Sequence, residues 1–139
     1  MSSNHSAAPA ARGQSQSIDL IGKISQIDGH WQPRVVAEMN DYQFKVVKVE
    51  GDFMWHRHTE TDETFIVLEG ELHIDVRGGP SGDGTIVLRA GQMGVVPKGV
   101  EHRPRASGEV KMLLIEPRGV VNTGDGPSSE RTVENDQWI

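Results

Sequence analysis

The chain of 139 residues contains no cysteine. This excludes disulfide bonds, thiolate metal sites and cysteine nucleophiles, and it suits a reducing compartment. Any bound metal ion would therefore need histidine and carboxylate ligands. No apolar run is long enough to cross a bilayer, and residues 1–17 lack the apolar middle section of a secretory signal. We therefore expect a cytoplasmic protein with no membrane partner.

Aromatic residues and positive charge are also scarce. Phe, Trp and Tyr together make up 5% of the chain, and the formal net charge is −6, with acidic residues spread along the sequence. This charge disfavours binding to a phosphate backbone, so we expect no nucleic-acid partner. No Ser-His-Asp arrangement and no phosphate-binding glycine loop is present. The expected partner is a small molecule.

The length and the turn residues indicate one small β-domain. A chain of 139 residues suits a single core, and Gly 16 with Pro 7 indicates many turns. From Arg34 onward, short apolar runs are bounded by Gly, Pro, Asn or Asp, which is typical of an antiparallel sandwich or barrel. The expected strands cover residues 34–39, 42–50, 53–58, 63–69, 71–76, 85–88, 94–97 and 110–116.

The segments that flank this region have a different composition. Residues 1–17 are rich in Ser, Ala and Gln and are expected to form a flexible leader. Ser17, followed by apolar residues at helical spacing, predicts a short N-terminal helix that leads into the barrel, and the whole unit is expected to span residues 18–117. The Gly-rich residues 77–84 are expected to form a mobile loop.

The last part of the chain, residues 118–139, is polar but ends in two large apolar residues, Trp138 and Ile139. We expect this C-terminal tail to pack on the barrel or on a partner subunit. The alternative is an unstructured tail, because chain termini tend to fray.

Three histidines and one glutamate are spaced so that a barrel could bring them together. His56 and His58 lie two residues apart in an expected strand, so their rings leave the same face, about 7 Å apart at Cα. Glu63 follows a polar connector that returns the chain. His102 follows the turn at 97–99 and begins a further expected strand.

Three imidazoles and one carboxylate form a donor set that suits one divalent transition metal ion, which could be Fe, Mn, Ni, Co, Cu or Zn. An octahedral ion would keep two positions for water or substrate. The alternatives are structural histidines and a salt-bridged Glu63. The remaining histidines, His5, His30 and His73, are interpreted as residues of the leader, a loop and a strand surface.

Two sequence motifs now carry a resemblance. Gly51-x4-His56-x-His58-x4-Glu63-x6-Gly70 and Gly91-x5-Pro97-x-Gly99-x2-His102 resemble the two signature motifs of the cupin superfamily. The gap after Gly51 is one residue shorter than is common in that family, and Ala106 stands where the second motif often ends in Asn. The flanking strands extend the resemblance over roughly residues 34–117.

The resemblance implies an all-β fold, a double-stranded β-helix (cupin) barrel, which is commonly a homodimer. The metal would be held deep in the barrel by His56, His58, Glu63 and His102. The resemblance further implies an enzyme that acts on a small organic substrate, because cupins include dioxygenases, sugar-phosphate isomerases and lyases. A non-catalytic small-molecule binding or sensor module is the alternative.

Dioxygenase-like chemistry is slightly favoured among these reactions. Apart from Lys98, Arg103 and Arg105 at the expected barrel rim, no cluster of Lys and Arg near the motifs offers an obvious phosphate clamp.

Four further residues are candidates for the substrate pocket. Strand alternation places Met54 on the face of His56, and Phe65 and Val67 on the face of Glu63, where they would line the pocket or form plain barrel core. Tyr42 is the only tyrosine, and its hydroxyl is a candidate for orienting a substrate. An edge-strand tyrosine with no chemical role is the alternative.

Overall fold

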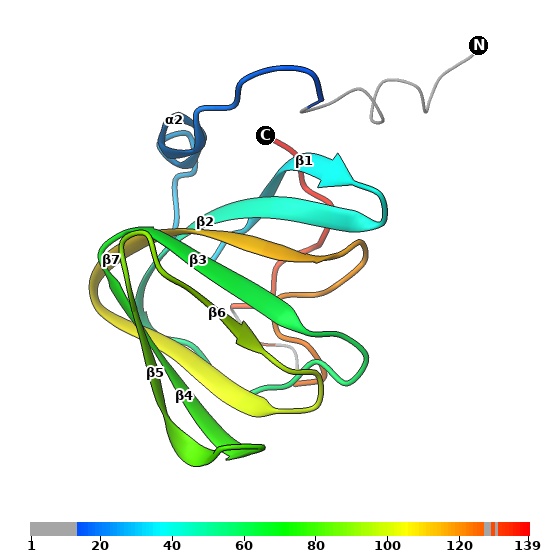
Figure 1. Ribbon diagram of the computed structural model, residues 1–139. Coiled ribbons are helices and arrows are strands. Elements are labelled where there is room, and N and C mark those ends of the chain that lie inside the picture. The colour runs from blue at the N-terminus through cyan, green and yellow to red at the C-terminus, as the bar shows by residue number, and fades with distance from the viewer. Residues whose placement is uncertain (1–13, 127–128, 130) are drawn as a thin grey trace.

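The computed structural model describes residues 14–126, 129 and 131–139, and most of the expected leader lies outside this range. No helix in the described part of the chain is long and apolar enough to span a membrane. Figure 1 shows a short helix beside a strongly curved β-structure. The elements are α2 (Leu20–Ile24), β1 (Arg34–Met39), β2 (Tyr42–Asp52), β3 (Glu63–Glu69), β4 (Glu71–Gly79), β5 (Gly82–Arg89), β6 (Met93–Val96) and β7 (Glu101–Pro117).

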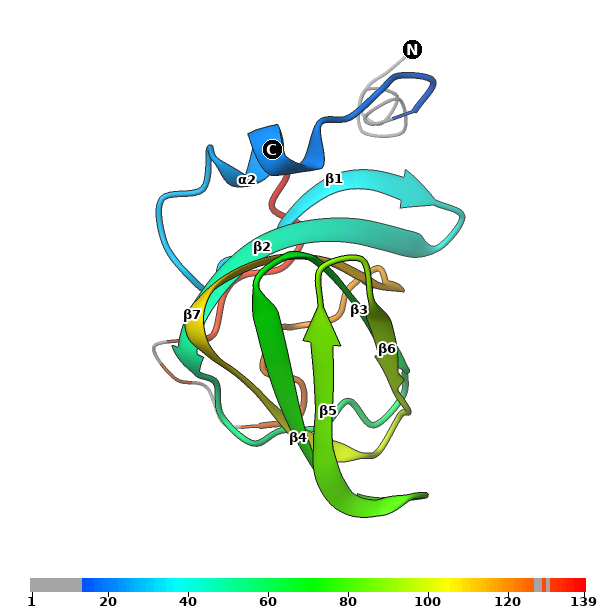
Figure 2. The same ribbon diagram turned by 60° about the vertical axis from the view of Figure 1, so that its left-hand side comes forward.

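The strands are hydrogen-bonded in the order β1-β2-β7-β3-β6, and β4 pairs with both β5 and β7. Every strand pair is antiparallel. The two views in Figures 1 and 2 show the strands curving around a common interior. The prediction of an all-β, double-stranded β-helix barrel with a short N-terminal helix is therefore confirmed.

The long strand β7 joins the two halves of the barrel. Its first residues, Glu101–Arg105, pair with β4, and its later residues, Lys111–Ile115, pair with β3. Along its other edge, β7 pairs with β2 from Arg105 to Pro117, with a register shift between Val49 and Gly51. Gly51 has a φ of 87°, a left-handed conformation that glycine adopts without strain. For the segment that forms β7, the sequence predicted two separate strands, one beginning at His102 and one over residues 110–116. In the structure they form one continuous strand.

Alternation along the strands separates an inner from an outer apolar cluster. In β2, Val47 and Val49 face the interior, whereas Val46 belongs to the outer cluster. The inner cluster fills the barrel and consists of Trp31, Val47, Val49, Phe53, Phe65, Val67, Leu72, Ile74, Leu88, Val96, Val100, Ala106, Val110, Met112 and Leu114.

The helix covers the outer cluster. Ile24 of α2 packs with Ile27, Val36 and Val46 on the outside of the barrel. The helix begins after Asp19, whose side chain accepts a hydrogen bond of 3.0 Å from the Gly22 backbone N–H. The predicted cap at Ser17 is wrong, because the Asp19 carboxylate satisfies a free N–H of the first turn and starts the helix two residues later.

The end of the chain docks on β1 of the same chain. The Val35 backbone N–H donates to the Gln137 carbonyl at 2.7 Å, and the Ile139 N–H donates to the Val35 carbonyl at 3.1 Å. Val35 and Trp138 form a parallel bridge. Ile139 also packs against the outer cluster, so backbone hydrogen bonds and apolar contact both hold the tail in place.

Two local expectations are wrong. Residues 53–58 form no strand, and only His56 is paired, with His102. The opposing Pro104 has no backbone N–H, so a regular ladder cannot continue there; its carbonyl accepts one bond from the Phe53 N–H. Residues 77–84 form a hairpin and not a loop, because β4 and β5 remain paired as far as Gly79 and Gly82.

Candidate metal centre

The backbone places His56 directly beside His102. The His56 N–H donates to the His102 carbonyl at 3.0 Å, and the His102 N–H donates back to the His56 carbonyl at 2.8 Å. This reciprocal pair brings the two imidazole rings to a centroid distance of 4.4 Å. A residue at the start of β7 and a residue in the connection after β2 therefore share one position in the barrel.

The turn before β7 positions the other half of the site. The Gly99 N–H donates to the His58 carbonyl at 2.8 Å. The Lys98 N–H donates to Asp62 Oδ1 at 2.9 Å, next to Glu63, the first residue of β3. Sequence reasoning missed this role of Asp62, since the turn and the carboxylate are 36 residues apart.

The structure brings the four predicted ligands together. His56, His58, Glu63 and His102 are all buried, and one ligand atom from each lies within 4.8 Å of the others. Glu63 Oε1 is 3.2 Å from His102 Nε2 and 3.3 Å from His58 Nε2. Mixed imidazole and carboxylate donors of this kind suit a first-row transition metal.

The backbone hydrogen bonds of two histidines turn their Nε2 atoms toward the cluster. His56 Nδ1 is 3.0 Å from the Met54 carbonyl, and His102 Nδ1 is 3.0 Å from the Val100 carbonyl. A carbonyl only accepts, so each Nδ1 is the donor, and each Nε2 is the nitrogen that would bind a metal; His102 Nε2 also contacts Glu63 Oε1 at 3.2 Å. Within the described chain, His58 Nε2 is buried and makes no hydrogen bond of good geometry. A metal ion would satisfy that nitrogen, so the residues fit the ion.

The pKa values follow from burial and from the neighbouring charges. Burial, together with the charge of His102, lowers the pKa of His56 to about 4. Burial also disfavours the charged form of His58, but the Glu63 carboxylate outweighs it and raises the pKa of His58. Burial acts to raise the pKa of Glu63, yet the contacts with His102 and His58 hold it well below its usual range. At neutral pH, Glu63 is ionised and His56 is neutral, as metal ligands must be.

A largely apolar cavity adjoins the cluster. Its volume is about 50 Å³, which holds a few water molecules. Of the three candidate lining residues, Phe65 lines this cavity, Val67 is buried in the core, and the Met54 carbonyl lies beside the His56 ring. Tyr42 is exposed at the start of β2 and does not line the cavity. The lining residues are Trp31, Pro33, Lys45, Val47, Val49, Phe53, His56, Glu63, Phe65, Pro104, Met112, Leu114, Glu116, Val120, Asn122, Val133, Glu134 and Asn135.

Trp31 adopts a strained backbone conformation in the cavity wall. Its φ is 64°, a region that costs a bulky residue on the order of 1–3 kcal/mol. Its backbone N–H donates to the Lys48 carbonyl at 2.9 Å, and its indole N–H donates to the Glu50 carbonyl at 3.0 Å. Its ring stacks on Phe53 at a centroid distance of 4.8 Å. These contacts fix a flat aromatic wall beside the cluster.

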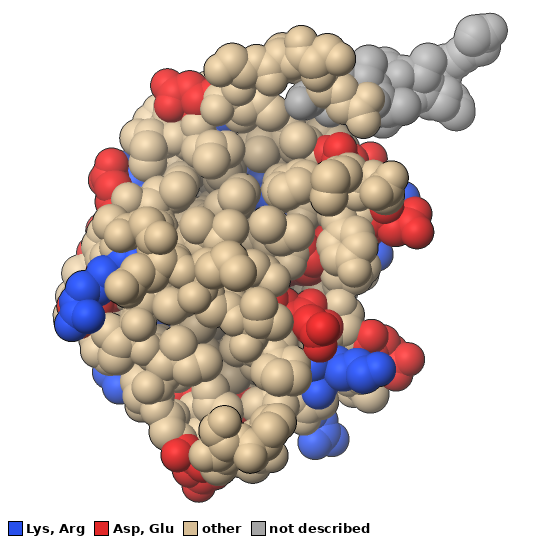
Figure 3. All heavy atoms as spheres, viewed as in Figure 1, with Lys and Arg blue, Asp and Glu red and all other residues tan. Residues whose placement is uncertain are grey.

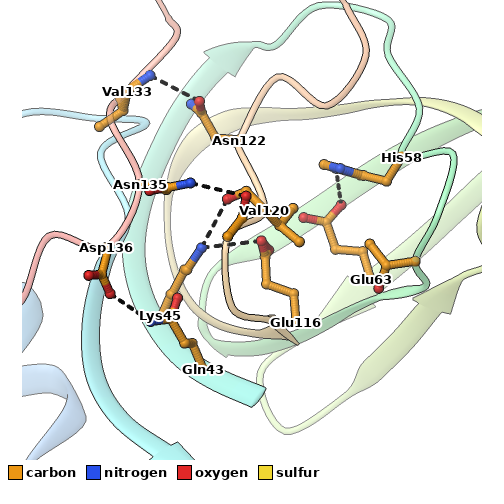
Figure 4. A network of polar contacts seen from close by, with 12 residues as sticks. Gln43, Lys45, His58, Glu63, Glu116, Val120, Asn122, Val133, Asn135 and Asp136 are labelled. Carbon is orange, nitrogen blue, oxygen red and sulfur yellow. Dashed lines mark hydrogen bonds and ion pairs between the residues drawn. The ribbon is translucent and has the colours of Figure 1, made fainter. Parts of the chain in front are cut away.

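A buried ion pair forms another part of the wall. Lys45 Nζ lies 3.3 Å from Glu116 Oε2 and 3.3 Å from the Val120 carbonyl, and Figure 4 shows all three beside Glu63. Burial, reinforced by the negative charge of Glu63, raises the pKa of Glu116 to about 8, although Lys45 opposes this. Sequence reasoning missed the pair. Its signal was the alternation of β2, which places Lys45 on the same inward face as Val47.

The raised pKa of Glu116 makes the stability of the metal-free protein depend on pH. A carboxyl group with a folded-state pKa of about 8, raised from 4.5, binds a proton more tightly when the chain is folded. Its contribution to the free energy of unfolding is therefore lost as the pH rises from about 4.5 through 8.

We therefore expect wild type without metal to lose stability between pH 6.5 and about 8, and E116Q to lose clearly less. Urea unfolding at several pH values measures this. Equal losses in the two proteins would show that Glu116 titrates normally in the folded state.

The C-terminal segment crosses the site beside His58. The Asp125 N–H donates to the Arg57 carbonyl at 2.9 Å. Asn122 holds this segment by donating to the Arg131 carbonyl at 2.6 Å and by accepting from the Val133 N–H at 3.0 Å. Several of its residues line the cavity, so the tail completes the wall of the site.

Gly124 allows the close approach of this segment. Its φ is 56°, and a Cβ atom there would collide with the Arg57 carbonyl. We expect G124A to cost about 1–3 kcal/mol of unfolding free energy and to expose the tail to protease. G108A is the matched control, since nothing lies within 4 Å of a Cβ at Gly108. Equal stability of the two variants would contradict this account.

The comparisons with known proteins agree with this architecture. The family model described as "Cupin domain" matches residues 44–116. A cupin-2 domain protein of Shewanella frigidimarina is 56% identical, with a TM-score of 0.67 over 73% of this chain and 94% of its own. YdbB of Bacillus subtilis, described as uncharacterized, is 38% identical over 81 residues, which are 58% of this chain and 68% of that protein. The chain therefore belongs to the cupin family.

A more distant likeness concerns the fold alone. Hydroquinone 1,2-dioxygenase from Sphingomonas sp. has a TM-score of 0.63 over 73% of this chain and 74% of its own, at 19% identity. The chain is thus a cupin whose barrel contains a buried His-His-Glu-His cluster that could hold a metal ion.

Proposed function

We propose that this cupin is a metal-dependent enzyme that converts a small organic substrate at one divalent transition metal ion. The observation that carries the proposal is the convergence of His56, His58, Glu63 and His102 on one buried point. When bound, such an ion supplies Lewis-acid or oxygen-activating chemistry. These four side chains would hold it.

Each residue around the ion has a distinct task. The Met54 and Val100 carbonyls fix the rings of His56 and His102 and keep their Nδ1 atoms protonated. Glu63 supplies one negative charge. The apolar wall, with Trp31 stacked on Phe53, limits the access of water and favours a substrate with an apolar body.

The distribution of cations supports a dioxygenase-like reaction over the isomerisation of a phosphate ester. Arg103 and Arg105 both donate to Asp75, at 2.9 and 2.8 Å, so this carboxylate holds their guanidinium groups outside the cavity. Figure 3 shows Lys and Arg in separate small groups on one face of the molecule. Lys45 is the one cationic side chain among the described lining residues. A phosphate clamp needs several such donors.

Oxygen uptake tests the proposed reaction. Protein loaded with iron is mixed with small phenols and carboxylic acids in an oxygen electrode, while substrate loss is followed by chromatography. Oxygen uptake equal to substrate loss, absent in H102A, is the expected result. Conversion without oxygen uptake would replace this reaction with an isomerase or lyase reaction. Binding without conversion would indicate a sensor.

We further propose that the protein is a homodimer. Met93 and Val95 of β6 and Val87 of β5 are 63%, 46% and 36% exposed, which is a large apolar exposure for a small domain. Light scattering coupled to gel filtration measures the mass directly, and a value near 15.3 kDa would indicate a monomer.

A further inference from the structure

The ion pair between Lys45 and Glu116 is unusual for the inner wall of so small a barrel. Both residues are buried, at 4% and 2% exposure, among apolar side chains of β2 and β7. A buried ion pair contributes little to stability, because removing two charges from water offsets their attraction. Valine at position 45 would continue the apolar face that Val47 and Val49 form. The packing of the barrel therefore gives no reason for a charge here.

The ammonium group of Lys45 has one N–H donor more than the acceptors around it. An ammonium group has three donors, and the described residues supply two acceptors, Glu116 Oε2 and the Val120 carbonyl. Lys45 lines the cavity that also contains His56 and Glu63. The third donor is thus available to an acceptor atom of a molecule in that cavity.

The charges at the site indicate which kind of molecule would accept the third hydrogen bond of Lys45. A divalent ion and Lys45 bring three positive charges to the site, and Glu63 and Glu116 bring two negative charges. The site is therefore net positive whether or not Glu116 carries a proton. A net positive charge next to an apolar wall is costly, so the site favours an anion over an uncharged molecule of the same shape.

We infer that the cavity takes a small monocarboxylic acid, whose carboxylate is bound by Lys45 while its apolar body lies against Trp31, Phe53 and Phe65. This inference rests on the proposed function and names its class of substrate. Lys45 acts as a specificity-determining residue because it separates an acid from an uncharged molecule of the same shape. The apolar wall accounts for an acid with a hydrocarbon body, and the single ammonium group accounts for one carboxylate and not two.

Calorimetric titration of the zinc-loaded protein tests this inference with matched probes. Acetate, propionate and butyrate are each compared with the corresponding amide, which has nearly the same shape and no charge. We expect at least one acid to bind about tenfold to a hundredfold more tightly than its amide in wild type. In K45M the difference should fall to within about threefold. K48M changes a lysine of the same strand outside the cavity and should keep the wild-type preference.

Two further measurements keep the outcome decisive. K45M leaves Glu116 without its partner, so K45M/E116Q removes both charges and serves where K45M unfolds. The zinc content of every variant is measured alongside binding. A preference for the acid that survives in K45M, or no preference in wild type, would overturn the inference even if one zinc ion is bound. A preference that depends on Lys45 in protein that binds no metal would uphold the inference and reject the proposed function.

Discussion

Replacing His102 by alanine is expected to lower the metal content from about one equivalent to less than a tenth, and to weaken metal affinity at least about a hundredfold. Losing even an outer partner of a ligand typically costs tenfold to a hundredfold in affinity, so losing a ligand should cost more. His102 is the most central of the four, because its ring contacts Glu63 and lies beside His56. Elemental analysis and competition with a chromogenic chelator measure the two quantities.

The matched control for this variant is H30A. His30 is half-exposed and pairs with Glu109 at 2.8 Å outside the barrel, so metal content should not change. H102A should remain folded, with a loss on the order of 2–4 kcal/mol for the space left by the ring. A wild-type metal content in H102A would remove His102 from the site. Loss of the β signal in circular dichroism would show that the barrel needs this ring to fold.

Lowering the pH is expected to release the metal, with affinity falling about tenfold per pH unit for each proton that a ligand must lose. His58 dominates this effect because Glu63 raises its pKa, so the ring takes up a proton before His56 does. His56, with a pKa of about 4, stays neutral down to pH 5 and adds nothing in that range. Metal titrations between pH 7.5 and 5.5 measure the slope.

Two histidine variants separate the source of this pH dependence. H73Q alters a partly exposed histidine of β4 and should keep the wild-type slope. H58Q should bind metal more weakly and with a shallower slope, because it removes the proton that competes. An affinity that is constant from pH 7.5 to 5.5 in wild type would contradict histidine ligation.

The outline of the fold was predictable because short-range pattern determines it. The bounds predicted for residues 34–39 and 63–69 coincide with β1 and β3. β3 alternates buried and outward residues, and both strands are short apolar runs that end at a turn residue, so their signals are local. Gly70 is such a signal, with a φ of 93° and the Glu109 carbonyl against its α-carbon, a conformation that favours glycine.

Errors arose where a distant residue decides the local structure. Nothing within residues 53–58 shows that they lie opposite Pro104, which is far along the chain and has no backbone N–H to continue a ladder. The same holds for the continuity of β7, which depends on β2 accompanying it through the shift at Gly51. Likewise, the docking of the C-terminal tail on Val35 depends on a contact between residues that are far apart in the sequence.

The candidate site divides in the same way. The four candidate ligands, which the fold brings close together, were predictable as a group because their spacing is a family pattern within two short motifs. The pocket wall was mostly missed, since Trp31, Lys45 and Asn122 come from three separate segments that only the folded barrel brings together. Of the predicted lining residues, Phe65 lies in the wall. Alternation predicts which face of a strand a side chain lies on, but not how far it lies from the cavity. Val67 lies on the same face as Phe65 and is buried in the core.

The metal content of the wild-type protein tests the central claim most directly. The protein is purified at neutral pH without chelator and without a metal-binding affinity tag, and its metals are quantified by mass spectrometry. The account predicts close to one equivalent of a divalent transition metal per chain, or one equivalent regained when the ion is supplied. A folded protein that neither carries such an ion nor takes one up, with His56, His58, Glu63 and His102 intact, would contradict the claim.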